Sequence, residues 1–144
     1  MNDRIFVDTN ILIYLYSTEI AKQQRIISLL KSENTFCTSI HVIMEFCNIL
    51  IKKLHYTRPA ISLAIQDFQR NLEIAGIGLE TIEKALFIQE KYRYAFFDSL
   101  VLATALMADC TAVYSEDMQH EQLIEEQVKI VNPFEIPVII PQNN

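Results

Sequence analysis

Apolar and polar positions along the chain form blocks, and the blocks predict strands alternating with helices. A short apolar run, Ile5–Val7, stops at Asp8 and is typical of a buried strand that ends at a carboxylate. The same reasoning predicts three further strands and one segment that is either a strand or a turn. These segments are Thr35–Thr38, Thr111–Ser115 and Val128–Val131, together with Glu73–Leu79.

Helical spacing of apolar residues fills most of the remaining chain. Ser39 is a suitable N-cap for a helix that runs to about Leu54, and Pro59 suits the first turn of the next helix, to about Asn71. The other predicted helices are Asn10–Ser17, Glu19–Ser32, Thr81–Tyr94 and the strongly apolar Phe97–Cys110, while Met118–Glu126 is expected to be a loop or a short helix.

Strands that alternate with helices predict a parallel sheet covered by helices on both faces. We therefore expect a three-layer α/β/α sandwich with a parallel sheet of about five strands. One domain is predicted over residues 1–134, followed by an irregular tail over residues 135–144 that contains Pro137 and Pro141.

Composition narrows the classes of function. The chain has 144 residues and a net charge of −6, which argues against a broad basic surface for nucleic acid but not against a metal-dependent nuclease. Its three cysteines are far apart without a CxxC pair, so neither a disulfide framework nor a zinc site is indicated. No apolar run reaches membrane-spanning length and no export signal is recognised, so the cytoplasm is expected.

Two acidic residues follow predicted strands. Asp8 ends the first strand, where capping the next helix and binding a ligand are equally reasonable roles. Thr9 or Asn10 would cap equally well and leave Asp8 free. Asp117 has the same position after a later strand; taken alone it is more typical of a turn, and its neighbour Glu116 is an alternative.

Two further acids lie in predicted helices. Glu45 belongs to the polar stripe of its helix on the simplest interpretation, and a zinc site with His41 is a weak alternative because no second ligand pair accompanies them. Asp98 stands in an apolar, aromatic run and is either an N-cap or a functional carboxylate. We favour a functional role, because an unpartnered carboxylate in such surroundings is costly.

The four acids together indicate a cation site. Two of them follow strand ends at the same expected edge of the sheet, and the other two come from helices that start there or pass it. Carboxylates about 4 Å apart repel by roughly 4 kcal/mol at an effective dielectric of 20, so a cluster requires protons or a cation. Carboxylate oxygens suit Mg²⁺ or Mn²⁺, which can activate water against a phosphodiester.

With these residues in place, the sequence resembles the PIN-domain family of metal-dependent ribonucleases, and most of all the VapC-type toxins of toxin–antitoxin pairs. Four segments carry the resemblance: Val7–Leu12, Ser39–Phe46, Phe97–Ala105 and Ser115–Asp117. The resemblance implies that Asp8, Glu45, Asp98 and Asp117 are the catalytic acids and bind Mg²⁺ or Mn²⁺. It further implies that Asn10, Ser115 and Thr9 support them.

By the same resemblance, the expected activity is hydrolysis of RNA, and the expected partners are a cognate antitoxin and a second copy of the chain. A catalytically silent PIN-fold module that binds proteins is the alternative, and a phosphatase or a DNA-directed nuclease would use the same acids. Five cations are candidates for phosphate contacts or a solvated face: Lys52, Lys53, Arg58, Lys91 and Arg93. Four aromatic residues are candidates for base stacking, or else for the core or a dimer interface: Tyr92, Tyr94, Phe96 and Phe97.

Overall fold

A computed structural model describes residues 2–137 and places a six-stranded sheet at the centre of the chain. The strand order is β3-β2-β1-β4-β6-β5, and all neighbours pair in parallel except β5, which is antiparallel to β6. The strands are β1 (Arg4–Val7), β2 (Thr35–Ser39), β3 (Glu73–Ala75), β4 (Ala112–Tyr114), β5 (Leu123–Ile124) and β6 (Val128–Val131). The predicted parallel sheet of about five strands is confirmed, with β5 added at its edge.

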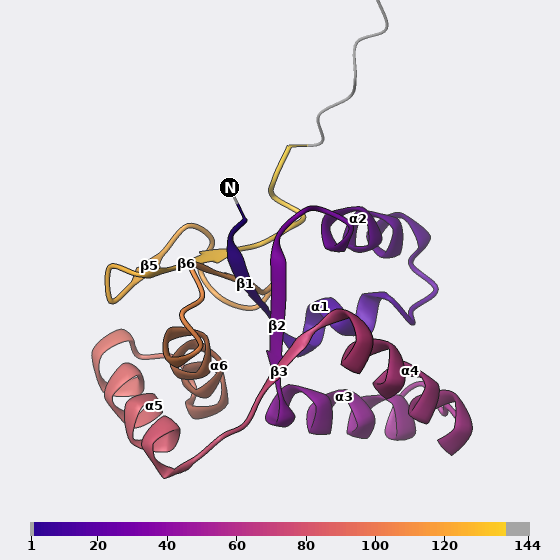
Figure 1. Cartoon of the computed structure of the whole chain (residues 1–144), viewed down its shortest axis with the longest axis horizontal. Helices are drawn as coiled ribbons and strands as arrows, with labels where there is room; N and C mark the ends of the chain where they lie inside the picture. Colours follow the sequence, from indigo (N-terminus) through magenta and orange to yellow (C-terminus); the bar gives the residue numbers. More distant parts are fainter. Residues whose placement is uncertain (1, 138–144) are drawn as a thin grey trace, which may run out of the picture.

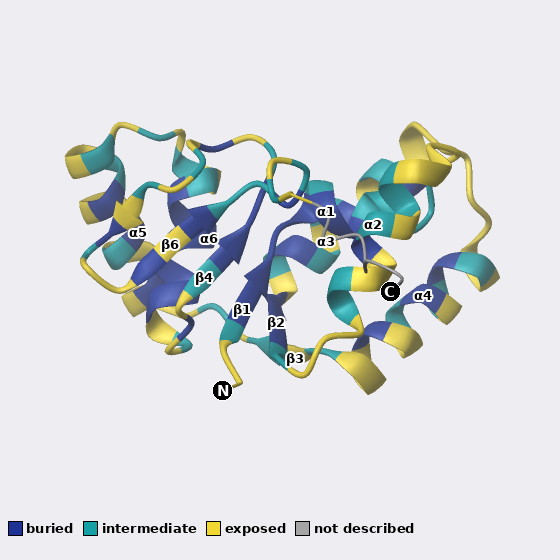
Figure 2. Cartoon of the chain, turned by 90° about the horizontal axis from the view of Figure 1, so that it is seen from above, coloured by how far each residue is buried: buried dark blue, intermediate teal, exposed yellow. Residues whose placement is uncertain are grey.

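Helices cover both sides of this sheet, as predicted. Figures 1 and 2 show α5 and α6 together on one side and α1, α2 and α4 on the other, with α3 leaving the end of β2. Their bounds are α1 (Thr9–Tyr14), α2 (Ile20–Leu30), α3 (Ile40–Lys52), α4 (Arg58–Asn71), α5 (Leu79–Tyr92) and α6 (Phe96–Met107). None of these described helices combines the length and apolar content that a membrane crossing needs.

The core lies on both faces of β1, which runs through the middle of the sheet. Phe6 and Val7 are completely buried, and Figure 2 shows the central strands as the most buried part of the chain. On the side of α4, the rings of Phe46 and Phe68 meet edge to face with centroids 4.8 Å apart. This packing fixes α3 and α4 against the helix that follows β1.

Helix α6 is buried over most of its length, which explains the strongly apolar run in the sequence. Every residue from Ser99 to Leu106 is buried. The helix begins at Phe96, and its N-cap residue, Ala95, offers no capping side chain. Asp98 therefore lies inside the first turn, so the alternative that Asp98 is the N-cap is wrong.

One sequence expectation needs correction at the other end of the chain. Residues Met118–Glu126 contain β5 rather than a helix, because Leu123 and Ile124 pair with β6 across a tight reversal. That reversal places Glu125 and Glu126 at φ 51° and 57°, in the left-handed region. Of the predicted tail, residues 138–144 lie outside the described residues.

Ser39 caps α3, as the sequence predicts. Its hydroxyl accepts a hydrogen bond from the backbone N–H of Val42 at 3.1 Å, and Ser39 itself is 1% exposed. Ser39→Ala is expected to lower the free energy of unfolding by about 1 kcal/mol, measured by chemical denaturation. The exposed cap of α4, Thr57, makes a longer 3.4 Å bond, and Thr57→Ala is the control that should cost less. Equal costs would contradict the importance of the buried cap.

Candidate functional site

The pairing of β1 with β4 brings two predicted acidic segments to the same edge of the sheet. Val7 is in register with Tyr114, and the backbone N–H of Asp8 donates to the carbonyl of Tyr114 at 3.0 Å. Asp8 and the segment Ser115–Asp117 consequently follow neighbouring strands. This is the position where open parallel sheets bind ligands.

Asp8 is a buried carboxylate held by two hydrogen bonds. It is 5% exposed; its Oδ1 accepts from the backbone N–H of Thr9 at 2.7 Å, and its Oδ2 accepts from the Ser115 hydroxyl at 2.9 Å. Asp8 is also the N-cap residue of α1, so the cap does not pass to Thr9 or Asn10. The capping role of Asp8 is therefore confirmed, and its role as a ligand stays a prediction.

Asn10 contacts both Ser115, which binds Asp8, and Asp117. The Asn10 amide donates to Asp117 Oδ2 at 2.9 Å and lies 3.3 Å from the Ser115 hydroxyl, while its carbonyl accepts from the backbone of Glu116. Asn10 and Ser115 thus hydrogen-bond to Asp117 and Asp8 respectively, and their role in supporting a cation site stays a prediction. Asp117 itself is exposed, with its carboxylate turned toward the site.

Glu116 points away from Asp117 into a different set of contacts. Its carboxylate accepts from the hydroxyl of Tyr14 at 2.8 Å and pairs with Lys22 at 3.2 Å. Of the two candidates for the fourth acid, the geometry thus favours Asp117. Sequence reasoning missed both Tyr14 and Lys22; the spacing of Tyr14 four residues after Asn10 on one helix was the available signal, whereas nothing in the sequence joins Lys22 to Glu116.

Glu45 reaches the site from the second turn of α3. The hydroxyl of Thr9 donates to Glu45 Oε2 at 2.8 Å, and His41 Nε2 lies 3.5 Å from Glu45 Oε1. The His41 ring stacks on that of Phe97, with centroids 4.9 Å apart and planes 7° from parallel, and its Nδ1 is buried without a partner among the described residues. These contacts position the glutamate beside Asp8, and they supply no further ligand for zinc.

Electrostatic coupling shows that all four acids share one region. Burial raises the pKa of Asp8 to about 6; the hydrogen bonds from Thr9 and Ser115 oppose this rise, and the charges of Asp98 and Glu45 add to it. Burial also raises the pKa of Asp98, and the charges of Asp117 and Glu45 raise it further. The predicted residues are thus brought together from four separate segments.

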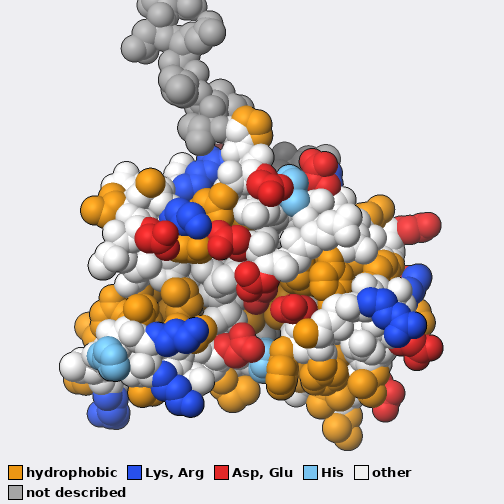
Figure 3. Space-filling view, turned by 180° about the vertical axis from the view of Figure 1, so that it is seen from behind, with side chains coloured by type: hydrophobic (Ala, Val, Ile, Leu, Met, Phe, Trp, Pro, Cys, Tyr) orange, Lys and Arg blue, Asp and Glu red, His pale blue; other side chains and the backbone are white. Residues whose placement is uncertain are grey.

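This arrangement fits a hard divalent cation. Within residues 2–137, no three His, Cys, Asp or Glu side chains lie close enough together to hold a metal ion by themselves, so the acids do not form a closed cage. Open sites made of a few carboxylates are what Mg²⁺ and Mn²⁺ use, because these ions keep several of their waters. The raised pKa of buried Asp8 indicates an anion that a cation would stabilise. Figure 3 shows acidic side chains gathered in the middle of one face, beside hydrophobic ones.

The four predicted stacking aromatics have different surroundings. The hydroxyl of Tyr92 accepts from the backbone of Glu125, and that of Tyr94 donates to Gln122, so both support the loop around β5. Phe96 packs against the small core cluster between α5 and α6. Phe97 is 56% exposed, and it is the member of the four that presents its ring to solvent beside the acids.

The five candidate cations lie in two different regions of the structure. Lys91 pairs with Glu125 at 3.1 Å on the far helix α5, and Arg93 is the left-handed C-cap of that helix. Lys52, Lys53 and Arg58 are exposed around the turn between α3 and α4, on the side of α1.

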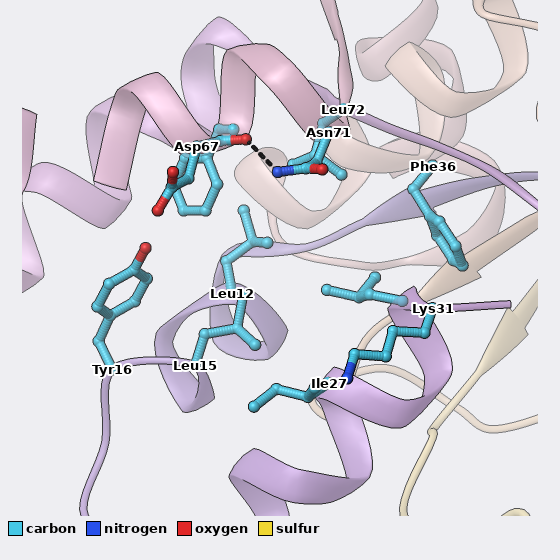
Figure 4. A pocket seen from close by; sticks show the side chains of 11 residues that line it. Leu12, Leu15, Tyr16, Ile27, Lys31, Phe36, Asp67, Asn71 and Leu72 are labelled. Carbon is cyan, nitrogen blue, oxygen red and sulfur yellow. Dashed lines mark hydrogen bonds between the residues drawn. The ribbon is translucent and has the colours of Figure 1, made fainter. Parts of the chain in front are cut away.

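A cavity of about 510 Å³ lies between α1, α2 and α4, away from the acids (Figure 4). Leu12 of α1 and Leu15, which follows α1, face Ile27 and Phe36 across it, and Figure 4 shows Lys31 at one side. Its described lining contains none of the four site acids. We therefore place the candidate site at the sheet edge and not in this largely apolar cavity.

Solved structures with the same fold include several toxin–antitoxin proteins. The VapC20 toxin of Mycobacterium tuberculosis, described as a toxin that cleaves the sarcin–ricin loop, is 21% identical with a TM-score of 0.63, covering 78% of this chain and 89% of that one. A toxin–antitoxin complex from Klebsiella pneumoniae is 23% identical with a TM-score of 0.67, covering 92% and 99%. VapBC2 of Rickettsia felis, bound to promoter DNA, is 15% identical with a TM-score of 0.66, covering 90% and 99%.

These likenesses concern the fold, whereas the family follows from the sequence itself. No curated protein sequence matches the chain. The sequence does match the family described as PIN domain over residues 5–125, which includes Asp8, Glu45, Asp98 and Asp117. With a match across most of its length and the fold to accompany it, the chain belongs to the PIN-domain family.

Proposed function

We propose that this protein is an endoribonuclease dependent on Mg²⁺ or Mn²⁺ and the toxin of a toxin–antitoxin pair. One observation carries the proposal: four carboxylates from separate segments converge at the carboxyl edge of the sheet, with Asp8 buried among them. We assign Asp8, Glu45, Asp98 and Asp117 as the cation ligands. When bound, the cation would supply positive charge for the phosphoryl oxygens and acidify an attacking water.

The chain's own residues prepare this site before the substrate arrives. The Ser115 hydroxyl and the Thr9 backbone fix both oxygens of Asp8, and the Thr9 side chain fixes Glu45. Asn10 holds Asp117 in place from α1. Carboxylates oriented in this way keep the ligand geometry constant, so that an RNA phosphate is bound and aligned for in-line attack.

The relatives support a partner as well as an activity. The structures from Klebsiella pneumoniae and Rickettsia felis are toxin–antitoxin assemblies, and the VapC20 toxin is described as cleaving the sarcin–ricin loop. We extend both features to this chain, with a cognate antitoxin that blocks the site and a homodimer as the assembled toxin. Cleavage of cellular RNA would place the protein in the cytoplasm.

The proposal is tested by incubating purified protein with RNA in Mg²⁺, in Mn²⁺ and in EDTA. Cleavage should require the cation and should be lost in Asp98→Asn. Single-stranded DNA and a generic phosphate monoester serve as competing substrates, and both should be cut far more slowly than RNA. Activity that survives both EDTA and Asp98→Asn would contradict the mechanism.

The assignment of the fourth acid gives a separate prediction. Asp117→Asn should lower kcat/KM for RNA at least about tenfold more than Glu116→Gln, because losing even an outer partner of a metal site typically costs 10–100-fold and we assign Asp117 as a ligand. Glu116 instead ties Tyr14 to Lys22, so its replacement should act mainly on stability. Equal losses of activity in the two variants, measured at saturating Mg²⁺, would show that the assignment is wrong.

A further inference from the structure

A second cavity, of about 600 Å³, adjoins the candidate site at Asn10, although its described lining contains none of the four acids. It lies between α1, the segment that follows α1 and the C-terminal end of α3. Asn10 belongs to its lining and also donates to the carboxylate of Asp117 at 2.9 Å. A molecule in this cavity would therefore be a direct neighbour of one bound at the acids.

Three tyrosines give this cavity aromatic walls. Tyr56 is fixed by its hydroxyl, which donates to the carbonyl of Tyr16 at 2.7 Å, and the two rings lie edge to face with centroids 6.3 Å apart. Tyr14 is held by hydrogen bonds of its hydroxyl with Glu116 and Lys22, and the Lys22 ammonium lies over one face of its ring, 4.8 Å from the centroid. Rings that are fixed before binding lose little entropy when a flat ligand packs against them.

The described lining of the cavity contains one basic residue and one acidic residue, on a protein that is acidic as a whole. Lys53 lines the cavity, and within the described residues it forms no ion pair. Lys52 precedes it in the chain and Arg58 begins the next helix; both lie outside the described lining, and both are exposed and unpaired within those residues. Glu19 is the acidic residue of the lining. Figure 3 shows Lys and Arg side chains on both sides of a hydrophobic strip next to the central acids.

We propose that this cavity binds an unpaired nucleotide of the RNA substrate next to the scissile phosphate. The base would pack against the tyrosines and the adjoining phosphate would contact Lys53. A base can enter only if it is not stacked in a helix, so the substrate would be cut in single-stranded or loop segments. An apolar peptide could pack against the same tyrosines, but it would leave the Lys53 ammonium without a partner. This inference rests on the proposed ribonuclease function.

Binding can be measured apart from cleavage by working in an Asp98→Asn background with Mg²⁺. The probe is a short fluorescein-labelled single-stranded RNA of mixed sequence, followed by anisotropy. Tyr56→Ala and Lys53→Glu should each weaken binding about tenfold, while Tyr56→Phe should retain it because the ring remains. Lys53→Ala should reduce the slope of log affinity against log salt by about 0.7.

Two matched controls separate the cavity from general surface effects. Phe87→Ala removes an exposed aromatic ring from α5, and Lys129→Glu reverses an exposed charge on β6; neither should change binding. In addition, a 4-thiouridine-substituted RNA should crosslink to residues 14–18 or 53–56, mapped by mass spectrometry.

Several results would overturn the subsite. Unchanged affinity in both Tyr56→Ala and Lys53→Glu would do so, as would equal affinity for an RNA duplex of the same length or crosslinks confined to other segments. If the same variants instead lose affinity only for a peptide or protein, the cavity is a protein-binding site and the inference is wrong. Failure of the wild-type protein to cut RNA, with RNA binding and its dependence on Tyr56 intact, would reject the proposed function but not the subsite.

Discussion

Replacing Asp8 with asparagine is expected to lower ribonuclease activity about a thousandfold, because a catalytic cation contributes several kcal/mol and each 1.36 kcal/mol is a factor of ten. Asparagine has nearly the same shape and can still accept from the Thr9 backbone. The loss would therefore report the missing charge at a buried ligand position rather than a misfolded site. Single-turnover cleavage of RNA at saturating Mn²⁺ measures it.

The matched control for this substitution is Asp109→Asn. Asp109 is exposed after α6, on the opposite edge of the sheet, and its φ of 58° is one that asparagine adopts readily. Its activity should equal that of the wild type. A decrease of less than about tenfold in Asp8→Asn would mean that Asp8 is a cap and not a catalytic ligand.

The elements that the sequence predicted well are those whose local signals agree with their tertiary setting. The first strand and α3 are examples: one is an apolar run that stops at a carboxylate, and the other follows a serine that does cap it. The edge strand β5 was missed for a physical reason. Two residues are too few for an alternating pattern, and Glu125 and Glu126 form a left-handed reversal where glycine or asparagine would be the usual signal.

The site shows the same division between local and long-range information. Asp8 and Asp117 were found because each follows a strand, and parallel strands share their carboxyl edge. Only the folded chain, however, shows the hydrogen bond between Thr9 and Glu45, which are 36 positions apart. The choice between Asp117 and Glu116 likewise depended on Lys22, which lies on α2, far from both acids in the sequence.

The second large effect concerns stability in the absence of metal. In EDTA, Asp8 is expected to make the free energy of unfolding fall by about 3 kcal/mol between roughly pH 4 and pH 7. The cause is the rise of its pKa from 3.8 to about 6 on burial. A folded-state pKa above the unfolded value means that the folded protein holds the proton more tightly. The stabilisation that this bound proton provides is fully present below the unfolded pKa of 3.8, and it is lost as the pH rises through about 6.

Asp8→Asn should remove this part of the pH dependence, so that in EDTA at neutral pH the variant is more stable than the wild type although it is inactive. Guanidinium denaturation across the pH range measures the free energy of unfolding of both proteins. If the two curves of this free energy against pH are parallel, burial does not raise the pKa of Asp8. Mg²⁺ should act in the opposite sense on the wild type, adding about 2.7 kcal/mol at a concentration a hundred times its dissociation constant. The variant should gain less stability from Mg²⁺. The negative charge of Asp8, which destabilises the metal-free protein, is also the charge that would bind the ion.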